Sequence, residues 1–142
     1  MPASVIKNTA IKPIDFNASS PPSSLRADQV SKPHHLTIYI PNKDANGRSI
    51  NVNYWIAATT QLLAHKFGGV SLSPPNQGVW LNPETFELIE ETTYKVCVFV
   101  ERDDLLRHGS LLASHIKKFG RETGQGEVLV RLDEKLLRYT QF

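Results

Sequence analysis

The segment Thr93–Glu101 constrains the fold of this chain more than any other. It has the highest density of β-branched and aromatic residues in the sequence, and such residues favour strands. Valines at the even positions alternate with Cys97 and Phe99, so apolar side chains point to both sides. A strand that is covered on both faces has this pattern. We therefore expect a central strand here, with residues 35–142 arranged around it.

The first 34 residues differ in composition from the rest of the chain. Residues 1–33 hold five of the nine prolines and no glycine. A segment of this kind buries too little apolar surface to offset the entropy lost on ordering. We expect residues 1–34 to be a Pro/Ser-rich tail, largely extended or disordered, and residues 35–142 to be a single α+β domain.

Charge and hydropathy exclude several classes of partner. The whole net charge of +2 is contributed by residues 1–35, so the remaining domain is neutral. A neutral domain lacks the basic surface on which phosphate-backbone binding depends, and we do not expect a nucleic-acid partner. No apolar run approaches the roughly 18–20 residues of a membrane span, and no apolar signal core follows Lys7 and Lys12. Without such a run, we expect no membrane contact. Cys97 is the sole cysteine and excludes an internal disulfide, so we expect a protein of the reducing cytoplasm.

Periodicity predicts the regular elements on either side of the central strand. Leu36–Ile40 alternates as a strand, with its leucine and isoleucines facing inward. A helix with apolar residues at i, i+3 and i+4 spacing follows, capped by Ser49 or Asn51 and ended by Gly68-Gly69. The remaining predicted elements are short strands near 70–73 and 78–81 around a proline break, a hairpin return through 86–91, a helix from Asp103 or Asp104 to about Gly120, and a strand over 127–132.

This order of elements predicts the architecture. Strand, helix, strand, strand, helix, strand is a βαββαβ pattern, and two helices of about 15 residues cover only one face of a sheet. We expect a ferredoxin-like two-layer α+β sandwich: an antiparallel four-stranded sheet with both helices on one face and the first and third strands in the middle. Residues 136–142 could add a short terminal strand.

Several short segments carry a resemblance to a family of small uncharacterised bacterial domains. They are the strand Leu36–Ile40, the helix containing Trp55 that runs to Phe67-Gly68-Gly69, the turn Gly78-Val79-Trp80, the strand Lys95–Val100 and the segment Gly124–Val130. The resemblance covers about two-thirds of the chain. It implies the ferredoxin-like fold and implies no activity.

Metal and catalytic motifs are weak in this sequence. His108 and His115 are seven residues apart, whereas paired helical metal ligands need a spacing of four. We expect surface imidazoles, no metal site and no cofactor. The adjacent Glu90 and Glu91 point to opposite faces of a strand, so at most one of them can join a site. The carboxylates are equally consistent with a solvated hairpin edge.

The sheet face that the helices leave bare is the first candidate for function. If the leucine and isoleucines of Leu36–Ile40 face the helices, then Thr37 and Tyr39 face away, and Lys95, Cys97 and Phe99 share that outer face. An exposed face with two aromatic rings favours burial against a second copy, the N-terminal tail or another protein. These five residues predict a non-enzymatic interaction or regulatory domain that forms a homodimer or docks a protein partner.

A small enzyme or ligand binder is the alternative. Its cleft would lie between the Gly78-Val79-Trp80 turn, Tyr94 and the Gly124–Glu127 loop. The residues expected to line that cleft are Trp80, Tyr94, Glu91, Gln125 and Glu127.

Overall fold

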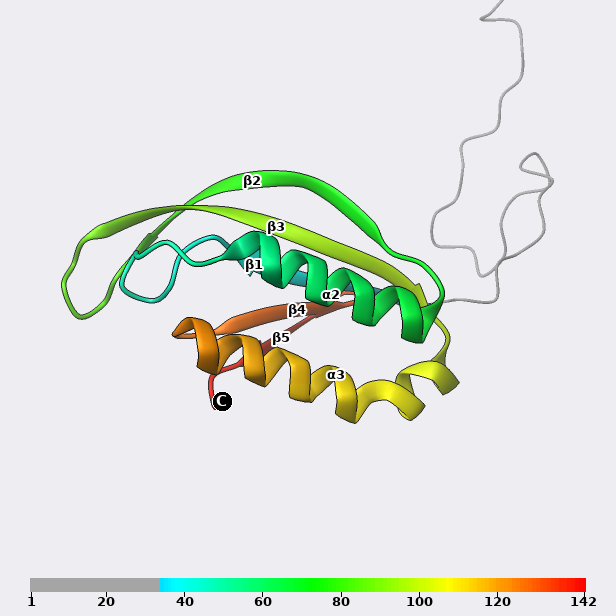
Figure 1. Cartoon of the computed structure of the whole chain (residues 1–142). Coiled ribbons are helices and arrows are strands. Elements are labelled where there is room, and N and C mark those ends of the chain that lie inside the picture. The colour runs from blue at the N-terminus through cyan, green and yellow to red at the C-terminus, as the bar shows by residue number, and fades with distance from the viewer. Residues whose placement is uncertain (1–33) are drawn as a thin grey trace, which may run out of the picture. The chain divides into compact units, whose positions relative to one another are not determined.

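A computed structural model describes residues 34–142, so the tail predicted over residues 1–34 lies outside the described residues except for His34, which begins the first strand. The described elements follow in the order strand, helix, strand, strand, helix, strand, strand (Figure 1). They are β1 (His34–Pro41), α2 (Val52–Phe67), β2 (Ser71–Leu81), β3 (Leu88–Val100), α3 (Arg102–Thr123), β4 (Val128–Leu132) and β5 (Lys135–Tyr139).

The strands form one antiparallel sheet in the order β2-β3-β1-β4-β5. The α+β class is confirmed, and β1 and β3 are neighbours with Ile38 paired to Val96. The prediction of a four-stranded ferredoxin-like sheet is wrong, because β5 adds a fifth strand beside β4. A two-residue turn makes this addition possible: Asp133 adopts a positive φ of 54° and reverses the chain directly from β4 into β5.

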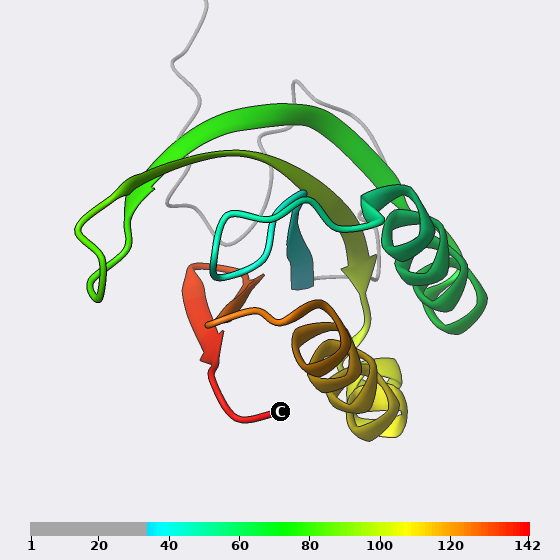
Figure 2. The ribbon, with the colours of Figure 1, turned by 60° about the vertical axis from the view of Figure 1, so that its left-hand side comes forward.

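Both helices pack on the same face of the sheet (Figures 1 and 2). Alternate residues of the strands meet the helices in one apolar cluster, which includes Ile38, Val96 and Val130 from the sheet. Leu63 of α2 and Ile116 of α3 are the matching buried positions on the helices. The opposite face of the sheet is therefore not covered by a helix, and Figure 2 shows it curving around the segment that joins β1 to α2.

The ends of α2 follow the expected capping chemistry. The side chain of Asn51 accepts a hydrogen bond from the backbone N–H of Tyr54, which satisfies one of the free donors of the first turn. Gly68 ends the helix in the left-handed conformation, with φ of 89°.

Helix α3 continues one turn beyond the expected end at Gly120 and ends before Gly124. Gly120 lies against the C-terminal residue, and a Cβ at this position would overlap the ring of Phe142 unless that side chain moved. The C-terminal ring is thus packed directly on the helix backbone, and the glycine provides the space for it.

Strand β2 is continuous through Pro74 and Pro75, where the sequence predicts a break. It is an edge strand, and its register against β3 shifts between Ser73 and Asn76. Proline lacks an N–H donor, and an irregular edge position tolerates that loss. The β2–β3 hairpin consequently forms one long arm that reaches beyond the helices (Figure 1).

No helix within residues 34–142 is both long and apolar enough to cross a membrane.

Candidate functional site

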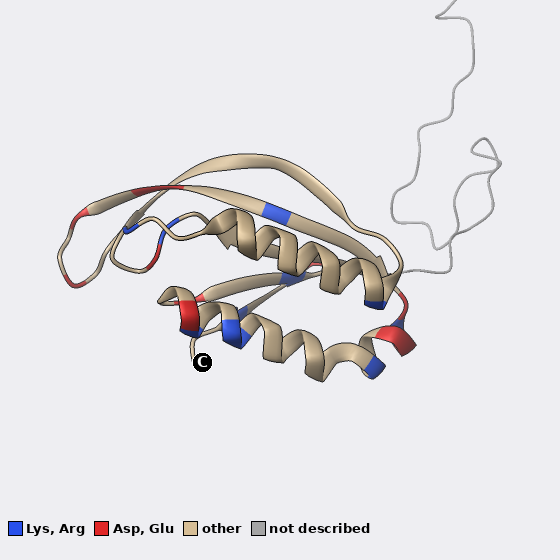
Figure 3. Cartoon of the chain, viewed as in Figure 1, with Lys and Arg blue, Asp and Glu red and all other residues tan. Residues whose placement is uncertain are grey.

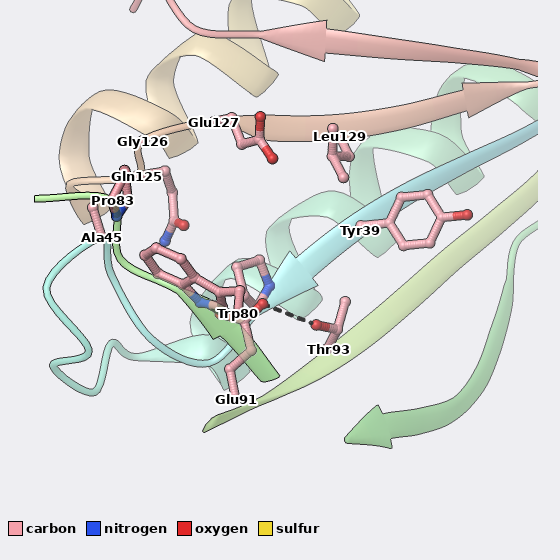
Figure 4. Close-up of a pocket in the computed structure, with 11 residues that line it drawn as sticks. Tyr39, Ala45, Trp80, Pro83, Glu91, Thr93, Gln125, Gly126, Glu127 and Leu129 are labelled. Carbon is pink, nitrogen blue, oxygen red and sulfur yellow. Dashed lines mark hydrogen bonds between the residues drawn. The ribbon is translucent and has the colours of Figure 1, made fainter. Parts of the chain in front are cut away.

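A cavity of about 590 Å³ lies on the sheet face opposite the helices. Its floor comes from strand positions that alternate with core residues: Tyr39 lies between buried Ile38 and Ile40, and Leu129 lies between buried Val128 and Val130. The cavity is lined by Tyr39, Pro41, Ala45, Trp80, Pro83, Glu91, Thr93, Gln125, Gly126, Glu127 and Leu129 (Figure 4). Successive side chains of these strands therefore alternate between the core on one face and the cavity on the other.

The hairpin arm supplies an aromatic side chain and a carboxylate that hold each other in place. The indole Nε1–H of Trp80 donates to Glu91 Oε2 at 3.1 Å, and the hydroxyl of Thr93 donates to Glu91 Oε1 at 3.5 Å. Gly78 is the residue directly opposite Glu91, so Trp80 reaches the carboxylate along the diagonal of the antiparallel pair. Both oxygens of Glu91 are thereby oriented in the cavity.

The negative charge of Glu91 has no basic partner within residues 34–142, where the ion pairs involve other carboxylates. The β2–β3 arm adds to this charge, because residues 71–100 contain three further glutamates and a single basic residue, Lys95. Figure 3 shows acidic residues along this arm, whereas the adjacent β1–α2 loop carries both signs of charge.

Glu127, on the other side of the cavity, is neutralised in part. Its Oε2 lies 3.0 Å from Nε of Arg138, which β5 brings alongside the start of β4. Both side chains are largely exposed, so this is a rim ion pair. The cavity consequently has one carboxylate with a counter-charge and one without.

Two loops from distant parts of the chain close one end of the cavity. The backbone N–H of Ala45 donates to the carbonyl of Gly124 at 3.0 Å, which joins the β1–α2 loop to the α3–β4 loop. Gln125 strengthens the junction, since its side-chain Nε2 donates to the carbonyl of Lys43 at 3.0 Å. Gly126 lies close to Ala45, where an added Cβ would be 3.7 Å from the alanine Cβ.

Four of the five residues predicted for the cleft line this cavity: Trp80, Glu91, Gln125 and Glu127. Tyr94 does not, because its position in β3 turns it to the helix side, where it packs against the core. Its neighbour Thr93 lines the cavity instead. Strict alternation from Glu91 identifies Thr93 in the sequence, whereas Ala45 and Pro83 belong to loops whose placement has no local sequence signal.

The five residues predicted for an interface divide into three environments. Tyr39 lines the cavity, and Lys95 is half-buried beside it in the β1–β3 register. Thr37 is buried and donates to Cys97 Sγ at 3.5 Å. Phe99 is 60 % exposed, with its ring centroid 4.8 Å from that of His35.

His115 differs from the surface imidazoles expected from the sequence. Its Nε2 lies 2.8 Å from the hydroxyl oxygen of Thr59, across the contact between α3 and α2. Burial, together with the nearby positive charge of Lys118, lowers the pKa of this imidazole. Within residues 34–142 there is no group of three or more side chains suited to hold a metal ion.

No family model matches the chain, and no curated relative matches it. The fold is similar to two solved structures. A phage SAM lyase in complex with S-methyl-5'-thioadenosine matches with a TM-score of 0.59 and 10 % identity, over 80 % of this chain and 94 % of that one. A phage SAM lyase in the apo state matches with a TM-score of 0.55 and 13 % identity, over 75 % of this chain and 88 % of that one.

These comparisons correct two expectations. The resemblance to an uncharacterised bacterial ferredoxin-like family is wrong, since no family model matches and the solved structures that share the fold are phage SAM lyases. The expectation of a non-enzymatic interaction domain is overturned by the same finding, because these neighbours are enzymes and one holds a small nucleoside. The comparisons give no support to a protein-binding or dimeric role.

Proposed function

We propose that the cavity binds S-adenosylmethionine and that the protein cleaves its sulfonium carbon–sulfur bond without water. Two solved structures of the same fold are phage SAM lyases, and one of them is in complex with S-methyl-5'-thioadenosine. S-adenosylmethionine yields that nucleoside when the bond from sulfur to the amino-acid chain breaks. At these low identities the comparison supports the fold, and the proposal for this chain depends on its own cavity.

The observation that carries the proposal is Glu91, a carboxylate with no basic partner in the described chain, fixed beside an indole. Trp80 and Thr93 orient its two oxygens. A sulfonium is a permanent cation that cannot donate a hydrogen bond, so negative charge and aromatic faces are the groups that attract it. Tyr39 and Trp80 supply aromatic faces within the same cavity.

The reaction balances without a group from outside the substrate. The bond between sulfur and the γ-carbon of the amino-acid chain breaks, and its electron pair stays on sulfur, which leaves as a neutral thioether. The substrate's own carboxylate oxygen forms a new bond to that γ-carbon and closes a lactone. The protein contributes by holding the chain folded for this attack.

The role of Glu91 follows from where the charge goes. Positive charge on sulfur is present in the bound substrate and declines as the bond breaks. Glu91 therefore stabilises the bound substrate at least as much as the transition state, and it contributes to binding. Its loss is expected to raise KM and to leave kcat nearly unchanged.

Incubation of the full chain with S-adenosylmethionine, followed by mass spectrometry, tests the activity. The expected products are S-methyl-5'-thioadenosine and a four-carbon product one water lighter than homoserine. Glu91→Gln should raise KM on the order of tenfold. Glu90→Gln is the matched control, because it removes the same charge from the neighbouring position on the other face, and its KM should stay within about twofold.

If reactions of the wild-type chain contain no S-methyl-5'-thioadenosine, the lyase activity is excluded. If homoserine is the first four-carbon product, the reaction is hydrolysis and the lyase mechanism is wrong. If Glu91→Gln and Glu90→Gln change KM equally, Glu91 has no specific role in the site, and the change in KM results from the overall charge of the arm.

A further inference from the structure

Gln125 is held by a chain of hydrogen bonds whose direction is fixed. The hydroxyl of Thr123 donates to the backbone carbonyl of Phe119, with 2.6 Å between the oxygens. Nε2 of Gln125 donates to that same hydroxyl oxygen at 3.1 Å and to the carbonyl of Lys43 at 3.0 Å. The network thus joins the end of α3 to the β1–α2 loop through one side-chain amide.

This direction determines which end of the amide faces each partner. A threonine hydroxyl has one proton, and Thr123 uses it on the helix carbonyl, so toward Gln125 its oxygen is an acceptor. The carbonyl of Lys43 is also an acceptor. A flipped amide would place Oε1 against two acceptors and lose both hydrogen bonds, so the nitrogen occupies that side.

The amide oxygen is left as the polar group that Gln125 presents to the cavity. Gln125 lines the cavity together with Trp80, and Figure 4 shows its amide beside the indole. Within residues 34–142, no donor to Oε1 of Gln125 is found among the hydrogen bonds. With both amide protons bound elsewhere, the Gln125 side chain offers the cavity an acceptor and no donor.

We propose that Gln125 selects the nucleobase of the ligand by accepting a hydrogen bond from an exocyclic amino group. This inference rests on the proposed function and names the base-reading residue of the same cavity. Trp80 provides the face on which a purine stacks, and Gln125 provides the acceptor at its edge. A 6-amino purine presents a donor to that acceptor, whereas a 6-oxo purine presents a carbonyl and creates a pair of opposed acceptors.

Thr123 is a positioning residue in this scheme, because it acts on the ligand through Gln125. Removal of the Thr123 hydroxyl eliminates one of the two hydrogen bonds that hold the Gln125 amide. The amide can then turn and offer a proton to a 6-oxo base, at the cost of one remaining hydrogen bond to Lys43. Selectivity between the two bases, rather than affinity as such, should respond to Thr123.

The experiment is isothermal titration of the full chain with S-methyl-5'-thioadenosine and with S-methyl-5'-thioinosine, which differ at the 6-position of the purine. The wild-type chain should bind the amino compound more tightly, on the order of tenfold. Thr123→Val should reduce that ratio, mainly by tighter binding of the inosine compound. Thr123→Ser keeps the hydroxyl and should keep the ratio.

A third variant separates selectivity from folding. Gln125→Leu removes the acceptor and should lower the affinity for the adenosine compound to near that for the inosine compound. The melting temperature of each variant checks that the loop junction persists. Equal affinity of the wild-type chain for both nucleosides, or an unchanged ratio in Thr123→Val, would overturn the base selectivity and leave the proposed function standing. Failure of both nucleosides to bind the wild-type chain would overturn this inference, and the proposed function falls with it only if S-adenosylmethionine also gives no S-methyl-5'-thioadenosine.

Discussion

The two faces of the sheet are made by the same strands and have opposite characters. Toward the helices, Ile38, Val96 and Val130 are packed in a continuous apolar core. Toward the other side, the intervening positions carry Tyr39 and Glu91 around an open cavity. The first face is completed by amphipathic helices and the second by two loops and a hairpin arm. Stability is therefore expected to reside on the helix face and ligand recognition on the cavity face.

A pair of truncations tests this division with the largest expected effect. Leu63 is fully buried between α2 and the sheet, and Leu63→Ala should lower the free energy of unfolding by about 3 kcal/mol. Phe99 lies on the other face with 60 % of its surface exposed, and Phe99→Ala should cost roughly 1 kcal/mol or less. Urea denaturation of both variants gives the comparison. Similar losses would show that the uncovered face carries as much of the stability as the core.

Alternation made the helix face predictable from sequence. Leu36, Ile38 and Ile40 are buried where their spacing places them, and Asn51 caps α2 as its side-chain chemistry indicates. The same alternation turns Tyr94 to the core, although it is predicted from the sequence to be a cleft residue.

The cavity face was less predictable because its end depends on contacts between distant loops. The hydrogen bond from Ala45 to Gly124 brings residues about eighty positions apart together, and no local pattern indicates it. The C-terminal region shows a similar limit. Gly120 and Gly124 both fit a helix stop, and the structure distinguishes them by the left-handed φ of 68° at Gly124.

The pH dependence of stability tests the helix face with a smaller effect. Burial, and then the charge of Lys118, lowers the pKa of His115 below its ordinary value of 6.5. Below that value the unfolded chain binds a proton that the folded chain resists, so this group makes the fold less stable as the pH falls from 6.5 toward the lowered pKa. Melting temperatures at about pH 7.5 and about pH 5.5 should differ less in His115→Gln than in the wild-type chain.

Asp133 does not confound this comparison. Hydrogen bonds from the backbone of His35 and the side chain of His34 lower its pKa below the ordinary 3.8, so its contribution is lost only at more acidic pH. An unchanged pH response in His115→Gln would mean that His115 keeps its ordinary titration in the folded chain, despite the contact with Thr59.

The smallest expected effect lies at the rim of the cavity face. Arg138 neutralises Glu127 in an exposed ion pair, so Arg138→Gln should change the free energy of unfolding by less than about 1 kcal/mol.

The same change leaves Glu127 without its counter-charge beside the proposed sulfonium site. Affinity for S-adenosylmethionine should then rise by about twofold to threefold at low salt, and the gain should fade as salt screens the carboxylate. S-methyl-5'-thioadenosine is the control in the same titration, because it is neutral at sulfur and should bind both chains equally. An equal gain in affinity for both ligands would show that the substitution acts through the shape of the rim and not through charge. A drop in melting temperature like that of Leu63→Ala would show that the cavity face contributes to stability as the helix face does.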